Sequence, residues 1–224
     1  MGLSLFQKII NESKTIASEV VLHVLGEPLL HPQILEYIDI VNASGMTVML
    51  TTNGTLLNSE LAQKKIRQIN ISLHAMVALP DQEAYLDQVV AFAREAQVYN
   101  PEGYINLRLW NRESRQNWKS RKLEGRIYLS LDKRFTWPNL DLPIIQTKGF
   151  CYGLETHFGV LVDGTVIPCC LDGAGHIPLG NIEAQALADI LSSARAQSMR
   201  TGFAKRDLVE PLCQRCEYRS RFHK

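Results

Sequence analysis

Cysteine is missing from the first 150 residues of this 224-residue chain, and all five cysteines lie between Cys151 and Cys216. The chain also has no apolar run close to the roughly 18 residues needed to span a bilayer. Its N-terminus lacks the long apolar core of a signal peptide. Blocks of like charge are absent, and the formal net charge is +1. We therefore expect a cytoplasmic protein with neither a membrane nor a nucleic acid as partner.

The composition is that of a globular protein, with 46% hydrophobic and 21% charged residues. A chain of this length can bury a substantial core as one medium domain or two smaller ones. The basic run from Arg112 to Lys122 is interpreted as a solvated face. In a reducing compartment, clustered cysteines are more often metal ligands than disulfides.

Helical and strand-like patterns alternate through the first 131 residues. Helices are predicted over residues 5–16, 33–44, 59–67 and 81–98. Strands are predicted over residues 19–25, 69–75, 104–110 and 126–131, and a strand with its following turn over residues 47–54. This alternation is typical of βα units around a parallel sheet, and it predicts a partial barrel in the α/β class. Residues 111–149 are the least patterned, which places a domain boundary near their end, between domains 1–148 and 149–224.

The cysteine-rich tail contains a strong turn signal. Asp163-Gly164 separates two apolar runs, so strands near 157–162 and 165–168 should pair and bring Cys151 and Cys169 to one end. Cys213 and Cys216 form a CxxC pair, whose spacing lets one turn present two sulfurs to one centre. These positions predict a metal site with four thiol ligands. Zinc remains an alternative to an iron–sulfur cluster, with His157 and His176 as further ligands.

Polar residues follow each predicted strand, in the sequences LGEPLLHP, TTNG, SLHA and RLWN. In parallel α/β folds the chemistry lies at the carboxyl ends of the strands. Each motif also has a simpler structural interpretation. Glu27 could be a polar turn residue, and Arg108 could form a structural ion pair with Glu27.

Together these motifs resemble the radical S-adenosylmethionine (SAM) enzymes that carry a SPASM or twitch domain for an auxiliary iron–sulfur cluster. Gly26, Glu27 and Pro28 resemble the family's GGE-type motif, which implies that the Glu27 carboxylate holds the amino group of SAM. Asn53 belongs to a turn that is common at the second strand end. Ser72 matches the position that contacts the ribose, and Arg108 matches a polar contact to the cofactor. The fold implied is a radical SAM β/α barrel without its first strand.

The tail matches the auxiliary-cluster pattern: Cys151, twelve residues, Gly164, four residues and Cys169, followed by the CxxC pair. The resemblance implies one 4Fe-4S auxiliary cluster, with Cys151, Cys169, Cys213 and Cys216 as ligands. Cys170 is then the spare thiol, although its adjacency to Cys169 leaves the opposite choice open.

The family's defining CxxxCxxC loop, which binds the SAM-cleaving 4Fe-4S cluster, has no counterpart in this sequence. We expect the sequence to be truncated, with that loop upstream of Met1, and we expect no catalytic residue in the chain itself. The implied function is formation of a 5′-deoxyadenosyl radical that modifies a peptide or oxidises a small substrate, with a flavodoxin or ferredoxin as electron donor. The alternative is a non-catalytic protein that binds a 4Fe-4S cluster or zinc.

Overall fold

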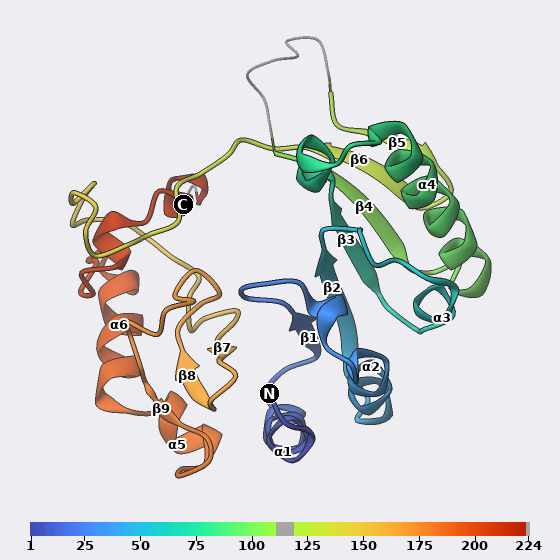
Figure 1. Cartoon of the computed structure of the whole chain (residues 1–224). Helices are drawn as coiled ribbons and strands as arrows, with labels where there is room; N and C mark the ends of the chain where they lie inside the picture. Colours follow the sequence, from blue (N-terminus) through green and yellow to red (C-terminus); the bar gives the residue numbers. More distant parts are fainter. Residues whose placement is uncertain (111–118, 223–224) are drawn as a thin grey trace. The chain divides into compact units, whose positions relative to one another are not determined.

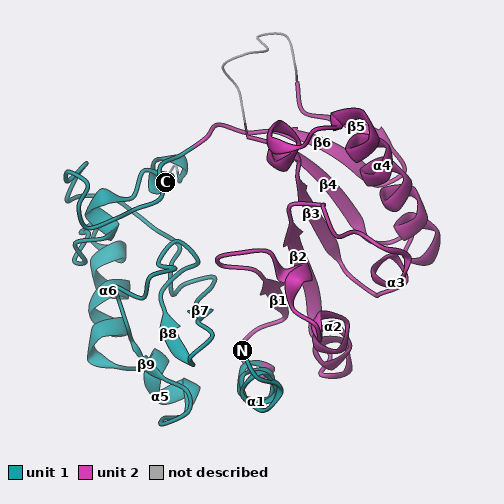
Figure 2. Ribbon diagram, viewed as in Figure 1, with its two compact units in different colours: residues 1–13, 135–224 teal, residues 14–134 magenta. Residues whose placement is uncertain are grey.

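A computed structural model describes residues 1–110 and 119–222. The chain divides into two compact units (Figure 2). Unit 1 contains Met1–Ser13 and Phe135–Lys224, and unit 2 contains Lys14–Arg134. The first helix and residues 135–148 thus group with the cysteine-rich part of the chain. The functional domain limits of 1–148 and 149–224 stay a prediction.

Unit 2 is built on a six-stranded sheet with the strand order β1-β2-β3-β4-β6-β5 (Figure 1). The strands are β1 (Glu19–Leu22), β2 (Thr47–Thr52), β3 (Gln68–Ser72), β4 (Tyr104–Leu109), β5 (Arg121–Glu124) and β6 (Ile127–Leu131). All neighbours pair in parallel except β5 and β6, which are antiparallel. The predicted parallel α/β sheet is confirmed, while β5 lies in the stretch for which no strand was predicted.

Helices cover one face of this sheet (Figure 1). They are α2 (Ile34–Ala43), α3 (Ser59–Ala62) and α4 (Gln82–Tyr99). Two short 3-10 helices, η1 (Pro28–Leu30) and η2 (Leu73–Ala78), follow β1 and β3 in the chain. Alternate strand residues, such as Val48 and Leu50 in β2, are completely buried. Successive side chains of a strand point to opposite faces, so the intervening residues Met49 and Thr51 lie on the face opposite to theirs.

Asparagine and aspartate begin two of these helices, as the sequence predicts. The side chain of Asn58 accepts a hydrogen bond from the Leu61 N–H at 2.9 Å, and that of Asp81 accepts one from the Ala84 N–H at 2.9 Å. The prediction that the first of these helices continues to residue 67 is wrong. The N–H of Arg67 already bonds to the Val48 carbonyl at 2.9 Å, so the chain must leave the helix early to enter β3.

Unit 1 combines a small antiparallel sheet of order β7-β8-β9 with short helices. Its elements are α1 (Leu3–Ser13), β7 (Gly159–Val160), β8 (Thr165–Ile167), β9 (Gly180–Asn181), α5 (Leu187–Leu191), α6 (Ala194–Ala204), η3 (Cys213–Arg215) and η4 (Tyr218–Arg221). The predicted pairing around Asp163-Gly164 is confirmed, because β7 and β8 pair antiparallel. Gly164 has a φ of +82°, which favours glycine at this turn. The third strand, β9, was not predicted.

The N-terminal helix α1 packs into the core of unit 1. Ile9 belongs to the same buried cluster as Val166, Ile190 and Met199. The Glu12 carboxylate also accepts a hydrogen bond from the Leu187 N–H at 2.6 Å, near the start of α5. The first helix therefore completes a core that the C-terminal residues would otherwise leave exposed.

The sequence predicts that the basic run is a solvated face and that no segment spans a membrane. Of the basic run 112–122, residues 112–118 lie outside the described residues, and the exposed strand β5 includes its end. Among the described residues, no helix combines the length and apolar character needed to cross a bilayer.

Candidate functional site

The turn after β1 contains a carboxylate held by several hydrogen bonds. Oε1 of Glu27 accepts from the hydroxyl of Thr52 at 2.7 Å and from the Leu29 N–H at 3.0 Å, and Oε2 accepts from the Asn53 N–H at 2.6 Å. Gly26 precedes it with a φ of +83°, and Pro28 follows as the first residue of η1. A carboxylate has about four acceptor positions, so three donors leave one position on Oε2 for a ligand.

The TTNG turn after β2 is stabilised by hydrogen bonds that involve one of its own side chains and a side chain of α4. Asn53 Oδ1 accepts from the Thr55 N–H at 2.9 Å, so its amide group stabilises the turn itself. The phenol of Tyr85, in α4, donates to the Asn53 carbonyl at 2.8 Å. Burial raises the pKa of Tyr85 to about 12, and the nearby charge of Glu27 adds to this. Tyr85 was not found from the sequence, because it lies on a helix 32 positions after Asn53.

Ser72 and Arg108 are neighbours at the ends of β3 and β4, where they pair directly in the parallel register. The Arg108 guanidinium lies 5.1 Å from the centroid of the Trp110 ring. Within the described chain no ion pair joins Arg108 to Glu27, so that structural interpretation of Arg108 is not supported. Burial lowers the pKa of His23, and the charge of Arg108 lowers it further, which brings the end of β1 within electrostatic range of β4.

A row of polar side chains crosses the face of the sheet opposite the buried apolar residues. Asn70 Nδ2 lies 3.4 Å from Thr51 Oγ1, Asn106 Nδ2 lies 3.3 Å from Asn70 Oδ1, and Ser130 donates to Asn106 Oδ1 at 2.5 Å. Four neighbouring strands thus present hydrogen-bonding groups on one face. A polar surface of this kind suits a hydrophilic ligand better than an apolar one. The alternation of Thr51, Asn70 and Asn106 with apolar residues is the signal that indicates this face in the sequence.

The second candidate site is in unit 1, where the five cysteines lie in three separate segments of the chain. Cys151 precedes the β7–β8 hairpin, Cys169 and Cys170 follow it, and η3 with its C-cap carries Cys213 and Cys216. All five cysteines are free thiols and are partly buried. The Cys216 N–H bonds back to the Cys213 carbonyl at 3.3 Å, which closes the CxxC turn.

The pKa values of the thiols show which of them lie within electrostatic range of one another. Burial raises the pKa of Cys213, and the neighbouring thiolates of Cys169, Cys151 and Cys216 raise it further. Burial also raises the pKa of Cys169 to about 12, although the backbone N–H of Leu171 acts in the opposite direction. In an apolar setting the four thiols remain protonated unless a cation or cationic cluster stabilises their thiolates.

Cys169 and Cys170 differ in their surroundings. Cys169 interacts electrostatically with Cys151, Cys213 and Cys216, whereas Cys170 interacts with Cys169 and Cys216. This pattern favours Cys169 over Cys170 as the fourth ligand beside the other three cysteines. Across the described residues, no three histidine, cysteine or acidic side chains are grouped closely enough to hold a single metal ion.

Backbone donors point at the sulfurs. The Gly153 N–H donates to Sγ of Cys151 at 3.4 Å, and the N–H groups of Tyr218 and Arg219 favour the thiolate of Cys216. Hydrogen bonds of this type stabilise thiolates that ligate iron. The donor set therefore fits an iron–sulfur cluster with four cysteine ligands.

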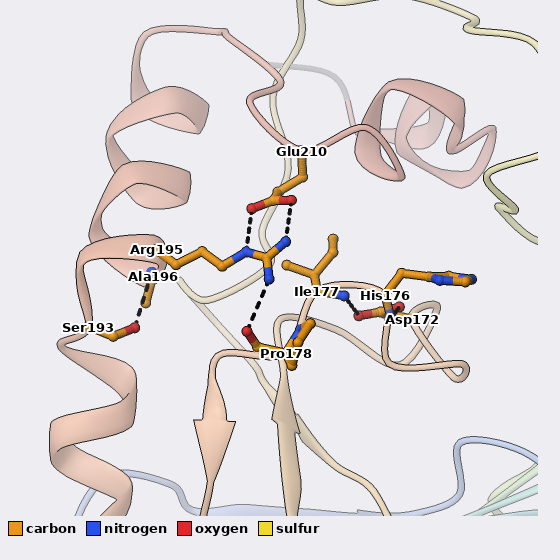
Figure 3. Close-up of polar contacts among 8 residues, drawn as sticks. All are labelled: Asp172, His176, Ile177, Pro178, Ser193, Arg195, Ala196 and Glu210. Atoms are coloured by element: carbon orange, nitrogen blue, oxygen red, sulfur yellow. Dashed lines mark hydrogen bonds and ion pairs between the residues drawn. The ribbon is translucent and has the colours of Figure 1, made fainter.

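Charged side chains in the segments between Cys170 and Cys213 are paired (Figure 3). Arg195 Nε and Nη2 donate to the two carboxylate oxygens of Glu210 at 2.7 and 2.8 Å, and Arg195 Nη1 donates to the Pro178 carbonyl at 3.1 Å. The buried Asp172 carboxylate accepts from the N–H groups of His176 and Ile177, each at 2.8 Å. These contacts tie the segment after Cys170 and the segment before Cys213 to the rest of unit 1.

One family model matches the cysteine-rich part of the chain. Residues 151–217 match the SPASM family, an iron–sulfur cluster-binding domain, and the match includes all five cysteines. No curated protein sequence matches the chain.

Solved structures share the fold of nearly the whole chain. BtrN in complex with AdoMet and 2-DOIA is 18% identical with a TM-score of 0.64, and the alignment covers 97% of this chain and 80% of BtrN. The enzyme anSMEcpe with bound AdoMet and Cp18Cys peptide is 14% identical with a TM-score of 0.56, covering 96% of this chain and 80% of that one. Both neighbours are radical SAM enzymes. The chain thus has the α/β fold of these radical SAM enzymes, and its residues 151–217 match the SPASM iron–sulfur cluster-binding domain.

Proposed function

We propose that this chain binds SAM at the carboxyl edge of its parallel sheet and belongs to a radical SAM enzyme that uses an auxiliary iron–sulfur cluster. The observation that carries the proposal is the fixed carboxylate of Glu27, which keeps an acceptor position while three donors hold it in place. A carboxylate that is fixed in place and has an unused acceptor position can accept a hydrogen bond from the ammonium group of an amino acid. SAM carries such an ammonium group.

Further residues at the same edge complement other parts of SAM. A guanidinium such as that of Arg108 suits a carboxylate or another acceptor on the ligand. The hydroxyl of Ser72, at the adjacent strand end, suits the ribose hydroxyls. Gly26, Pro28 and Asn53 act through the backbone, since they shape the two turns that hold Glu27.

In unit 1, Cys151, Cys169, Cys213 and Cys216 are the proposed ligands of a 4Fe-4S cluster, with Cys170 as the spare thiol. When bound, such a cluster transfers single electrons and ties the three cysteine segments together. The chain's own contribution is to bury the thiols partly and to point backbone N–H groups at Cys151 and Cys216.

Two substrate classes are compatible with this proposal. The structure of anSMEcpe contains a peptide, and that of BtrN contains the small molecule 2-DOIA. The row of Thr51, Asn70, Asn106 and Ser130 supports a polar substrate on this polar face of the sheet. A flavodoxin or ferredoxin is the proposed electron donor.

A non-catalytic metal-binding protein is the second candidate. The observation that favours it is that every cysteine of the sequence lies at or after Cys151, so these residues supply ligands for the auxiliary site alone. In that case the sheet would keep its fold without binding SAM.

Anaerobic reconstitution followed by metal and ligand analysis tests both candidates. We expect about four iron and about four sulfide per chain, and measurable SAM binding in equilibrium dialysis. About one zinc with no sulfide would contradict the cluster. A loaded cluster without SAM binding would favour the non-catalytic candidate instead.

A further inference from the structure

Arg219 is a buried arginine three residues after the last cysteine. It lies in η4, and its side chain and backbone together are only 5% exposed. Arg221, in the same turn, is partly exposed, and its guanidinium lies 4.8 Å from the centroid of the Tyr218 ring. Two arginines of one helical turn thus occupy different environments.

Part of the Arg219 guanidinium is buried without a compensating hydrogen bond in the described part of the chain. Its Nε has no hydrogen-bond partner there, and no carboxylate among those residues forms an ion pair with it. Arg195, by contrast, has an anionic partner, because two hydrogen bonds join its guanidinium to the Glu210 carboxylate. A buried cation without an anionic partner is strongly unfavourable, so Arg219 requires a negative charge that the protein side chains do not supply.

Two thiols lie within electrostatic range of the Arg219 guanidinium. The backbone N–H of Arg219 favours the thiolate of Cys216, and its positive charge favours the thiolates of Cys216 and Cys151 against the effect of burial. The guanidinium also packs against Gly149, two residues before Cys151, where a Cβ atom would collide with Nη1. Both ends of the cysteine set therefore lie next to this one cation.

We propose that Arg219 is a positioning residue that provides the counter-charge of the cluster held by Cys151, Cys169, Cys213 and Cys216, and that it raises the reduction potential of that cluster. This inference rests on the proposed function. Four thiolates give such a cluster a net negative charge, and one-electron reduction adds another without breaking a bond or moving a proton. A fixed positive charge in a poorly solvated site stabilises the more negative, reduced form more than the oxidised form.

Redox titration of the anaerobically reconstituted full chain tests this role. Dithionite is the reductant, and visible absorbance and electron paramagnetic resonance report the fraction reduced. Arg219→Gln should shift the midpoint potential to a more negative value, whereas the charge-conserving Arg219→Lys should retain most of the wild-type potential. Arg221→Gln is the matched control, because it removes the same charge from the same turn at a more exposed position, and it should leave the midpoint unchanged.

Each outcome distinguishes an electrostatic role of Arg219 from a purely structural one. Equal midpoints for Arg219→Gln and the wild type would overturn the inference. If Arg219→Gln fails to bind iron, Arg219→Lys must load with the wild-type potential, and loss of iron from both variants would make Arg219 a structural residue. Failure of the proposed function looks different, because the wild-type chain itself would then contain no iron and sulfide.

Discussion

The carboxylate of Glu27 and the hydroxyl of Thr52 are joined by a hydrogen bond of 2.7 Å between the ends of two adjacent parallel strands. Thr52 is 2% exposed, and its Oγ1 in turn accepts from the Gly54 N–H at 3.0 Å. One buried hydroxyl therefore connects the turn after β1 to the turn after β2. This connection fixes the carboxylate before any ligand arrives, and preorganisation of that kind lowers the cost of binding.

Replacing Glu27 should weaken SAM binding more than it weakens the fold. Glu27→Ala removes the proposed ammonium acceptor, and we expect a loss of at least about tenfold in affinity, or about 1.4 kcal/mol. Thr52→Val keeps the carboxylate but removes a donor to it, so a smaller loss is expected. Equilibrium dialysis with labelled SAM measures both. Glu60→Ala, an exposed change in α3, is the control, and an unchanged affinity in Glu27→Ala would make Glu27 a turn residue only.

Tyr85→Phe tests how α4 supports the same edge. The change removes the hydrogen bond of 2.8 Å to the Asn53 carbonyl, which is a partly buried acceptor. We expect the free energy of unfolding to fall by about 1–2 kcal/mol in a urea titration. Tyr99→Phe, at a 55% exposed position of the same helix, should change it by less than about 0.5 kcal/mol. Similar effects of the two changes would show that the phenol does not stabilise the turn.

The sequence predicts the parallel sheet well because its signals are local. β2 and β4 are apolar at alternate positions, and Asn58 and Asp81 are strong N-cap residues. The predicted length of α3 was wrong because the end of this helix depends on a contact with residues distant in sequence. The pairing of Arg67 with Val48 in β2 ends the helix early, and no property of residues 59–67 alone reveals that contact.

For the proposed cluster site, the local turn signal predicts the hairpin between the first cysteines, while the ligand set itself stays a prediction. The predicted β7–β8 hairpin is present, and the thiols of Cys151 and Cys169 interact electrostatically. Tyr85 and Arg219 could not be predicted, because their roles depend on burial and on partners that are distant in sequence. Tyr85 reaches Asn53 from another element, and the importance of Arg219 lies in the absence of a partner for its Nε among the described residues.

Serine substitutions separate the proposed ligands from the spare thiol. Cys213→Ser should lower iron and sulfide content and also thermal stability, because a cluster that joins distant segments contributes to folding. Cys170→Ser should leave both close to wild type, since Cys170 does not share the electrostatic contacts of Cys169 with Cys151 and Cys213. The opposite result, with Cys170→Ser losing iron and Cys169→Ser retaining it, would exchange the roles of the adjacent cysteines.

Gly149→Ala tests the packing of the Arg219 guanidinium without changing any charge. Gly149 has a φ of +151°, and a Cβ atom there would collide with Arg219 Nη1. We expect the guanidinium to move, the visible absorbance of the cluster to be lost at a lower temperature, and the free energy of unfolding to fall by about 1–3 kcal/mol.

Gly175→Ala is the matched control, because its φ of +68° is also positive but its Cβ would meet only a Leu161 methyl group at 3.1 Å. The control should show the backbone effect alone, about 1 kcal/mol. If the two variants lose the cluster at the same temperature, the contact between Gly149 and Arg219 does not support the cluster, and the reason for a glycine at 149 is its backbone conformation.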